Sequence, residues 1–316
     1  MSGKAAALEE LYASFANLNM EGGWHRRFPA LWPEPRENFL PHVWHYSDVR
    51  PILERAGELV DTELAERRNL TMFNPVEGNV YPTVRTIVAA YQMVKPGEFA
   101  RAHRHTPNAL RLILEGSGTY TVVDGKQVEM RPGDVLLTPN WAWHSHENQG
   151  QEECYWMDFL DVPLVHLLEP MFYQPHPEGR EAAVEVLDEA PIAFRREDIA
   201  ADLAAARPDA DGVRRITLGP ASLDTLALDV LELPPGTAMN SPRETANAVF
   251  AVIRGQGAMT VGDERTQWAF GDTIAMPAWR KYALHAGEQG ALLLKVSDRT
   301  LLEKLGWYRT DADPAD

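Results

Sequence analysis

The spacing of hydrophobic residues changes along the chain and predicts long helices only near its beginning. Apolar residues recur at the helical period close to the N-terminus, which predicts a helix within residues 1–20. Residues 24–35 are aromatic and rich in proline, so we expect an irregular arm there. The helical period returns over residues 48–60, where a second helix is predicted with Asp48 as its N-cap.

The pattern then changes to short apolar runs separated by glycine and proline, which is typical of strands joined by turns. Such runs extend from about 84 to 163 and return from 213 onwards. Residues 164–205 lack them and are expected to form a helical or irregular connection. The tail from 298 begins as a short helix and ends in polar residues. The pattern therefore predicts a mainly β protein with two strand-rich halves.

The two strand-rich halves resemble each other in sequence. Residues 109–125 align with 248–263, and residues 130–144 align with 268–282. Glycines and prolines recur at a nearly constant offset: Gly116 with Gly255, Gly133 with Gly271, and Pro139 with Pro277. Two copies of one closed barrel explain this repeat, because closure removes the exposed edges of a sheet. A flat sandwich is the alternative.

The predicted organisation is all-β, with two barrels and a helical N-terminal segment. At 316 residues, the chain is long enough for two domains of ordinary size. Its predicted parts are an N-terminal helical or irregular arm (1–80), a first barrel (81–165), a helical or irregular linker (166–210), a second barrel (211–300) and a C-terminal tail (301–316).

Composition and charge argue against several classes of protein. The formal net charge is -16 and no cluster of Lys and Arg interrupts it, whereas a nucleic-acid-binding domain usually shows a basic face. No apolar run is long enough for a transmembrane helix. Acidic residues occupy the place of a signal peptide's apolar stretch. The single cysteine, Cys154, excludes an intramolecular disulfide and any multi-cysteine metal site. We expect a cytoplasmic protein that binds neither nucleic acid nor membranes.

Three histidines form the strongest candidate for chemistry. His103 and His105 are separated by one residue, so on a strand both side chains point to the same face. His144 lies on a later segment that follows a Pro-Gly-Asp turn. Three imidazoles from neighbouring strands can bind one metal ion and leave other coordination positions open. Zinc, copper, iron and nickel all accept such ligands, so the residues alone do not identify the metal.

The spacing around these histidines resembles both cupin motifs, G-x5-H-x-H-x3,4-E-x6-G and G-x5-P-x-G-x2-H-x3-N. The resemblance implies a bicupin, with two double-stranded β-helix (jelly-roll) barrels. Ala109 stands where the motif has its glutamate ligand, and Trp141 stands where it has glycine. Without the glutamate, three neutral imidazoles leave the charge of a divalent ion uncompensated. Such a site favours an anionic chelating substrate, such as a carboxylate beside a phenolate.

Three further polar residues lie close to the histidines in sequence. Arg111 lies in an apolar run, so an inward guanidinium there needs an anion, and a substrate carboxylate fits. A surface ion pair is the alternative for Arg111. His146 shares the strand face of His144. We favour substrate contact or acid–base chemistry for His146; the alternatives are a fourth metal ligand, a residue that supports a metal ligand, or a histidine at the rim of the barrel. Asp158 holds a histidine, touches the substrate or lies on the surface.

The second copy lacks the histidines. Pro242 and Glu244 stand at the positions of the histidine pair, and Tyr282 stands at the position of the third histidine. No three-imidazole site can form there, and we expect the second barrel to be structural or to serve subunit contacts.

The chain also resembles the gentisate 1,2-dioxygenase family, which includes salicylate, 5-nitrosalicylate and 1-hydroxy-2-naphthoate ring-cleaving dioxygenases. The resemblance is carried by GEFARAHRHTPNALRLILEG (97–116), GDVLLTPNWAWHSHENQG (133–150), WMDFLDVPLVHLLEPMF (156–172) and, more weakly, residues 41–70. It implies iron(II) as cofactor, a small aromatic carboxylate and O2 as partners, and a homo-oligomer, commonly a tetramer.

The resemblance also assigns roles to residues. His103, His105 and His144 match the iron ligands. The residues that match substrate contacts are Arg111, His146, Asp158 and Arg67, with Arg68 as the alternative to Arg67. Pro107 stands where glutamine is common, and Val88 stands where an aromatic residue is common. Both departures favour a bulky or non-hydroxyl substituent at C5 of the ring.

The sequence therefore predicts an iron(II)-dependent dioxygenase that opens gentisate or a substituted salicylate between its carboxyl-bearing and hydroxyl-bearing carbons. Within this reaction, 5-nitrosalicylate or 1-hydroxy-2-naphthoate is the alternative main substrate. A metal-dependent isomerase and a non-catalytic small-molecule-binding bicupin are the alternatives from other classes.

Overall fold

The computed structural model describes residues 3–26, 29–188, 190–219 and 223–311. The chain divides into a short N-terminal unit that ends at Arg36 and a large unit that begins at Glu37. The N-terminal unit contains α1 (Gly3–Ala16), which confirms the first predicted helix. Within it, the ring of Tyr12 stacks on His25 with centroids 3.6 Å apart. The polar end of the tail, from 312, lies outside the described residues.

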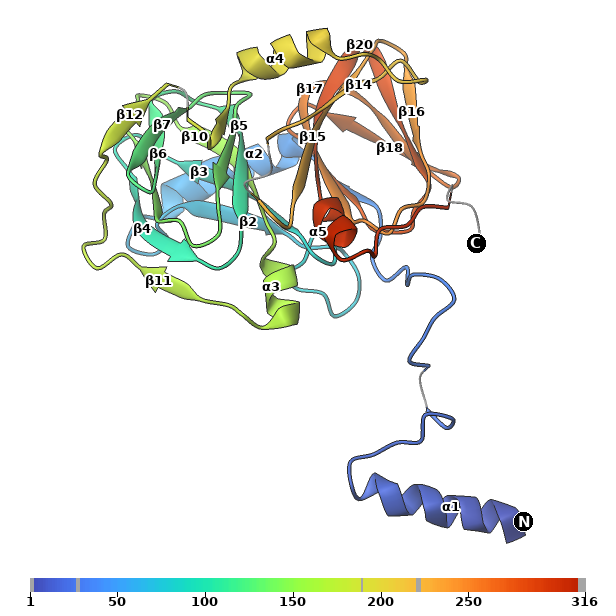
Figure 1. The fold of residues 1–316 in the computed structure, drawn as a ribbon. Coiled ribbons are helices and arrows are strands. Elements are labelled where there is room, and N and C mark those ends of the chain that lie inside the picture. The colour runs from blue at the N-terminus through green and yellow to red at the C-terminus, as the bar shows by residue number, and fades with distance from the viewer. Residues whose placement is uncertain (1–2, 27–28, 189, 220–222, 312–316) are drawn as a thin grey trace. The chain divides into compact units, whose positions relative to one another are not determined.

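The large unit contains two β-barrels (Figure 1). The elements of the first half are β1 (His42–Trp44), α2 (Tyr46–Leu59), β2 (Arg68–Met72), β3 (Val88–Val94), β4 (Phe99–His105), β5 (Ala109–Glu115), β6 (Thr119–Val123), β7 (Lys126–Met130), β8 (Val135–Thr138), β9 (His144–Asn148), β10 (Cys154–Leu160), α3 (Val162–Leu168), β11 (Tyr173–Pro175) and β12 (Glu185–Leu187). Those of the second half are β13 (Ala193–Phe194), α4 (Arg196–Ala205), β14 (Arg214–Thr217), β15 (Ala227–Leu233), β16 (Ala238–Ser241), β17 (Ala248–Val261), β18 (Glu264–Ala269), β19 (Thr273–Met276), β20 (Tyr282–Ser297) and α5 (Arg299–Lys304).

The sheet order confirms the all-β prediction. The first barrel consists of two six-stranded sheets, with strand orders β13-β8-β5-β10-β3-β2 and β11-β4-β9-β6-β7-β12. The second barrel is built on the order β1-β19-β17-β20-β15-β14, with β16 and β18 paired to its long strands. None of the helices in the described residues has the length and apolar character needed to cross a membrane.

The second predicted helix is present as α2, but the prediction that Asp48 caps it is wrong. Asp48 lies inside the first turn, and His45, whose backbone is extended, occupies the N-cap position. The cap is supplied from a distant part of the chain, because Asp272 Oδ1 accepts a hydrogen bond from the backbone N–H of Tyr46 at 2.9 Å. A local sequence motif cannot reveal a cap that comes from a residue so far along the chain.

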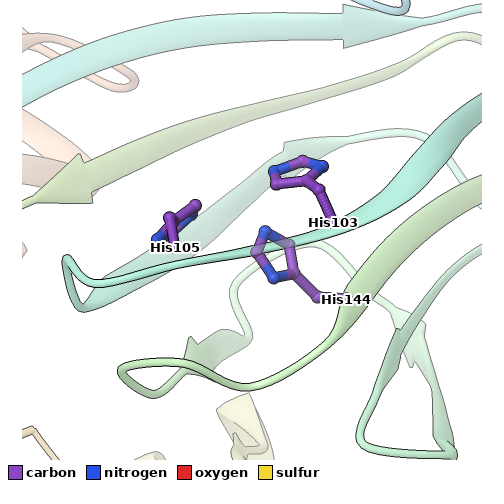
Figure 2. Close-up of side chains that lie close together, drawn as sticks. All are labelled: His103, His105 and His144. Atoms are coloured by element: carbon purple, nitrogen blue, oxygen red, sulfur yellow. The ribbon is translucent and has the colours of Figure 1, made fainter. Parts of the chain in front are cut away.

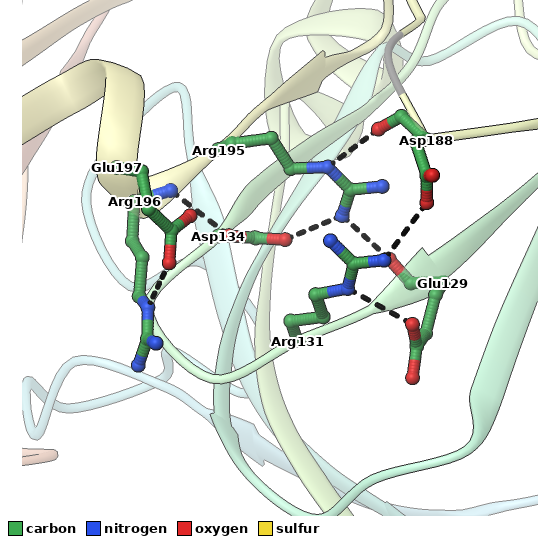
Figure 3. Close-up of polar contacts among 7 residues, drawn as sticks. All are labelled: Glu129, Arg131, Asp134, Asp188, Arg195, Arg196 and Glu197. Atoms are coloured by element: carbon green, nitrogen blue, oxygen red, sulfur yellow. Dashed lines mark hydrogen bonds and ion pairs between the residues drawn. The ribbon is translucent and has the colours of Figure 1, made fainter.

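The first barrel caps a helix of the second half in the same way. Asp134 Oδ1 accepts a hydrogen bond from the backbone N–H of Arg196, the first residue of α4, at 2.9 Å. Asp134 Oδ2 pairs with Arg195 Nη1 at 2.5 Å (Figure 3). Asp134 and Asp272 follow the matching glycines of the two copies. Each Gly-Asp turn therefore caps the helix that precedes the strands of the other barrel.

Short strands are exchanged in the same way. β1 pairs with β19 of the second barrel, and β13 pairs with β8 of the first. Residues 166–210, for which a linker is expected, also contain β11 and β12, which pair with β4 and β7 of the first barrel. The exact domain boundaries stay a prediction, but the exchange means that each half contributes segments to the other.

Candidate metal centre

The histidine group lies at the ends of two adjacent strands of the first barrel. His103 and His105 come from β4 and His144 begins β9, and the antiparallel pairing of these strands sets His103 opposite His144. The potential ligand nitrogens of the three side chains all lie within 4.8 Å of one another (Figure 2). The structure thus brings together the three histidines that the sequence singles out. Three imidazoles at this separation can hold one divalent cation.

Backbone carbonyl groups orient all three rings in the same manner. The Nδ1 atoms lie 3.0, 2.8 and 3.1 Å from the carbonyl oxygens of Arg101, Pro107 and Ala142, for His103, His105 and His144 respectively. A protonated Nδ1 donates to its carbonyl and leaves the Nε2 lone pair free for a metal ion. Metal-binding histidines usually donate the N–H of their other ring nitrogen to a carbonyl or carboxylate in this way, which fixes the orientation of the ring. The donor set therefore fits a metal held through three Nε2 atoms.

Burial keeps these imidazoles neutral. It lowers the pKa of His103 to about 4, with the nearby positive charge of Arg67 lowering it further. Burial likewise lowers the pKa of His105, and it lowers the pKa of His144 well below its usual value. Only neutral imidazole binds metal, so near pH 7 a cation does not have to displace a proton from these ligands.

Four linked polar side chains form a wall of the first barrel beside the histidines: Arg67, Gln92 on β3, Arg111 on β5 and Asp158 on β10. The buried carboxylate of Asp158 lies opposite Arg111 in the pairing of β10 with β5, and Arg111 Nε donates to Asp158 Oδ1 at 3.2 Å. Gln92 Nε2 donates to Asp158 Oδ2, and Gln92 Oε1 accepts a hydrogen bond from Arg67 Nε. The anion that Arg111 needs is thus supplied in part by Asp158.

Gln92 is a residue of this wall that the sequence reasoning missed. Its signal was present, because Gln92 is the one amide in the strand VAAYQMV, all of whose residues are buried. Tyr173 was also missed. Its ring centroid lies 5.2 Å from that of His103, and it belongs to β11, in a segment for which the sequence predicts only a linker.

The wall has a surplus of positive charge. Arg67 and Arg111 are two cations against the single carboxylate of Asp158, and a bound divalent metal would add further positive charge. Arg68, the alternative to Arg67, points elsewhere: it is buried and bonds Glu98 and the carbonyl oxygen of Val60. The electrostatics therefore suit an anionic ligand that reaches both the metal and Arg67.

His146 lies beside this wall without being part of the histidine group. It is buried, and its ring centroid lies 6.1 Å from that of His144 and 5.7 Å from that of Trp156. Its Nδ1 atom has no hydrogen-bond partner within the part of the chain that the structure describes. Since buried polar atoms are usually paired, the free nitrogen suits contact with a bound ligand.

The two departures from the family pattern have different surroundings. Val88 is buried on β3 and shares a strand face with Ala90 and Gln92, by the alternation of side chains along a strand. The carbonyl of Pro107 is the acceptor that orients His105. Val88 can therefore shape the space beside Gln92, whereas the backbone carbonyl of Pro107 orients the ring of His105.

The second barrel keeps the backbone of the site and lacks its ligands. Trp279 N–H donates to the carbonyl of Glu244 at 2.7 Å, as Trp141 N–H donates to that of His105 at 2.9 Å. Both tryptophans have positive φ, of 63° and 62°, at the position where the motif has glycine. The side chain of Glu244 pairs with Lys295 Nζ at 2.7 Å. Among the described residues, a histidine group of this kind occurs in the first barrel alone.

Comparisons with known proteins agree with this arrangement. A family model described as a cupin domain matches residues 90–162. The chain is 32% identical to a 5-aminosalicylate 1,2-dioxygenase of Comamonas sp, over 96% of this chain and 90% of the relative. It is 32% identical to a gentisate 1,2-dioxygenase of Streptomyces sp, over 96% and 95% of the two chains. The crystal structure of a salicylate 1,2-dioxygenase from Pseudaminobacter salicylatoxidans superposes with a TM-score of 0.88, at 29% identity, over 96% of this chain and 97% of the other. That dioxygenase has also been crystallised as an adduct with gentisate.

Proposed function

Because the chain belongs to the gentisate and salicylate 1,2-dioxygenase family of ring-cleaving oxidoreductases, we propose that it opens an aromatic hydroxy acid with O2, using iron(II) at His103, His105 and His144. The bond between the carboxyl-bearing and hydroxyl-bearing carbons breaks, and both oxygen atoms enter the ring-opened product. The observation that carries the proposal is the common orientation of the three imidazoles, each held through Nδ1 by a backbone carbonyl.

The residues beside the histidines have separate tasks in this proposal. Iron(II), when bound, supplies the redox chemistry that joins the substrate to O2. The Arg111 guanidinium pairs with the substrate carboxylate, and Asp158 holds that guanidinium in place through the bond at 3.2 Å. Burial lowers the pKa of His146 well below its usual value, so its imidazole is neutral and its Nδ1, unpaired among the described residues, can hold the proton of the ring hydroxyl through a hydrogen bond. Arg67 adds positive charge on the same side.

We propose gentisate or a substituted salicylate as the substrate, with 5-nitrosalicylate or 1-hydroxy-2-naphthoate as the alternative. Val88 supports a substituted ring, because valine fills less space than the aromatic residue common at that position. The relatives support several ring acids, since the names of similar proteins include gentisate, 5-aminosalicylate and 1-hydroxy-2-naphthoate dioxygenases. A homotetramer and a cytoplasmic location stay predictions.

Replacement of Val88 by tryptophan is expected to reduce activity on large rings selectively. Val88 is 2% exposed, so the larger side chain must occupy space next to Gln92. We expect kcat/KM for 1-hydroxy-2-naphthoate to fall by about 10-fold relative to that for gentisate, since a change in pocket size of this kind is worth about 1–3 kcal/mol. Steady-state kinetics on both acids measure the ratio. An equal fall for both substrates would mean that Val88 does not face the ring.

Oxygen uptake with a panel of ring acids tests the function directly. The purified protein is loaded with iron(II), zinc or manganese, and oxygen consumption and aromatic absorbance are followed for gentisate, salicylate, 5-substituted salicylates and 1-hydroxy-2-naphthoate. We expect turnover with iron(II) alone. Turnover without oxygen consumption would favour a metal-dependent isomerase, and binding without turnover would favour a non-catalytic bicupin.

A further inference from the structure

The loop that follows the ligand His105 is fixed by an asparagine. Residues 106–108 join β4 to β5, and Pro107 of this loop supplies the carbonyl that orients His105. Asn108 Oδ1 accepts the backbone N–H of Asn140 at 2.8 Å, and Asn140 Nδ2 donates to the carbonyl of Thr106. The position of the Pro107 carbonyl therefore depends on how Asn108 is held.

A buried carboxylate holds Asn108 in turn. Asp161, which is 1% exposed, accepts the backbone N–H of Asn108 on Oδ1 at 2.8 Å and its side-chain amide on Oδ2 at 3.1 Å. The hydroxyl of Thr225 also donates to Asp161 Oδ2, and Asn108 Nδ2 lies 2.9 Å from Thr225 Oγ1. Thr225 belongs to the second copy, just before β15, so a residue of the second barrel is in direct contact with this support.

We call this contact between an aspartate, an asparagine and a threonine of the other copy a clasp. A second clasp is present in which the two copies exchange roles. Asp298 accepts the backbone N–H of Asn247 at 2.8 Å, its amide at 2.9 Å and the hydroxyl of Thr86 at 2.6 Å. Asp298 is 1% exposed, like Asp161. The difference lies in what each clasp supports, because the loop held by Asn247 follows Glu244, which pairs with Lys295 and has no imidazole to present.

We propose that Asp161 and Asn108 are positioning residues for the metal ligand His105, and that Thr225 makes the second barrel part of the support of the metal centre. The inference rests on the proposed metal site. The presence of two clasps allows a role in stability to be distinguished from a role in metal binding. Both clasps join the barrels and should contribute similarly to stability, whereas only the clasp of Asp161 ends at a metal ligand.

The test compares Asp161→Asn with its matched control Asp298→Asn. The affinity for Co²⁺, its visible absorption spectrum and the thermal unfolding of the metal-free protein are measured for each variant. We expect both variants to lower the midpoint of unfolding by similar amounts. We expect Asp161→Asn to weaken Co²⁺ binding by about 10-fold and to change the spectrum, since loss of an outer-shell partner typically costs about 10–100-fold in affinity. Asp298→Asn should leave affinity within about twofold and the spectrum unchanged.

A milder pair, Thr225→Val and Thr86→Val, keeps the side-chain shape and guards against misfolding of the aspartate variants. Thr225→Val is expected to weaken Co²⁺ binding by about threefold, in the range of one lost hydrogen bond, while Thr86→Val leaves it unchanged. Equal effects within both pairs would overturn the inference and leave the clasps as structural contacts only. Failure of the unmodified protein to bind Co²⁺ would instead contradict the proposed metal site.

Discussion

Replacement of His144 by alanine is expected to abolish metal binding and ring cleavage together. His144 is buried, faces His103 across two paired strands and has its Nδ1 committed to the carbonyl of Ala142. Losing an outer-shell partner of a metal ligand already costs about 10–100-fold in affinity, so losing a direct ligand should cost more than about 100-fold. Metal analysis after dialysis and oxygen uptake with gentisate measure the two losses.

His285→Ala is the matched control for this variant. His285 lies on β20 of the second barrel, where its Nε2 is 3.1 Å from Thr260 Oγ1. The histidine group belongs to β4 and β9 of the first barrel. The control should retain iron and activity. If the His144 variant kept stoichiometric iron with unchanged affinity, the assignment of the metal centre would be wrong.

Replacement of Arg111 by glutamine is expected to weaken substrate binding and stability at the same time. The charged contact with a substrate carboxylate is worth about 1.5–3 kcal/mol, which corresponds to a rise in KM of about 10- to 150-fold. Arg111 is also 1% exposed and pairs with Asp158, so its loss leaves a buried carboxylate without its cation. Breaking a buried ion pair from one side typically costs about 3–5 kcal/mol of unfolding free energy.

The double variant Arg111→Gln/Asp158→Asn separates the two effects. Removing both charges should recover much of the unfolding free energy, because no unpaired charge remains in the interior. The KM for the ring acid should stay high, because the cation that meets the carboxylate is still absent. Denaturant unfolding and steady-state kinetics give the two quantities. Recovery of KM in the double variant would show that Arg111 acts only through the stability of the fold.

The sequence predicted those parts of the protein that depend on local spacing. The alternation of side chains along a strand was sufficient to pair His103 with His105, and glycines and prolines at a nearly constant offset revealed the two copies. Interactions between distant segments were out of reach. The carboxylate that accompanies Arg111 was named as a separate candidate, yet only the register of β10 against β5 joins them.

The caps of the helices show the same limit. Asp48 satisfied the local rule for an N-cap, but the group that meets the first N–H of α2 is Asp272. Gln92 and Tyr173 were missed for a related reason, since each gains its meaning from a neighbour on another strand. Propensity and periodicity describe a segment by itself, whereas these residues depend on which segments fold together.

The reciprocal caps give the second barrel a structural task that does not depend on metal ligands. Asp272 and β19 of that barrel hold the beginning of α2 and the strand β1, which precede the strands of the histidine group in the chain. A shortened chain that contained the first copy alone would lose the partner strand of β1 and the Asp272 carboxylate that accepts the backbone N–H of Tyr46. The second barrel therefore stabilises the segments that lead into the first barrel, a task that its fold performs without any histidine group of its own.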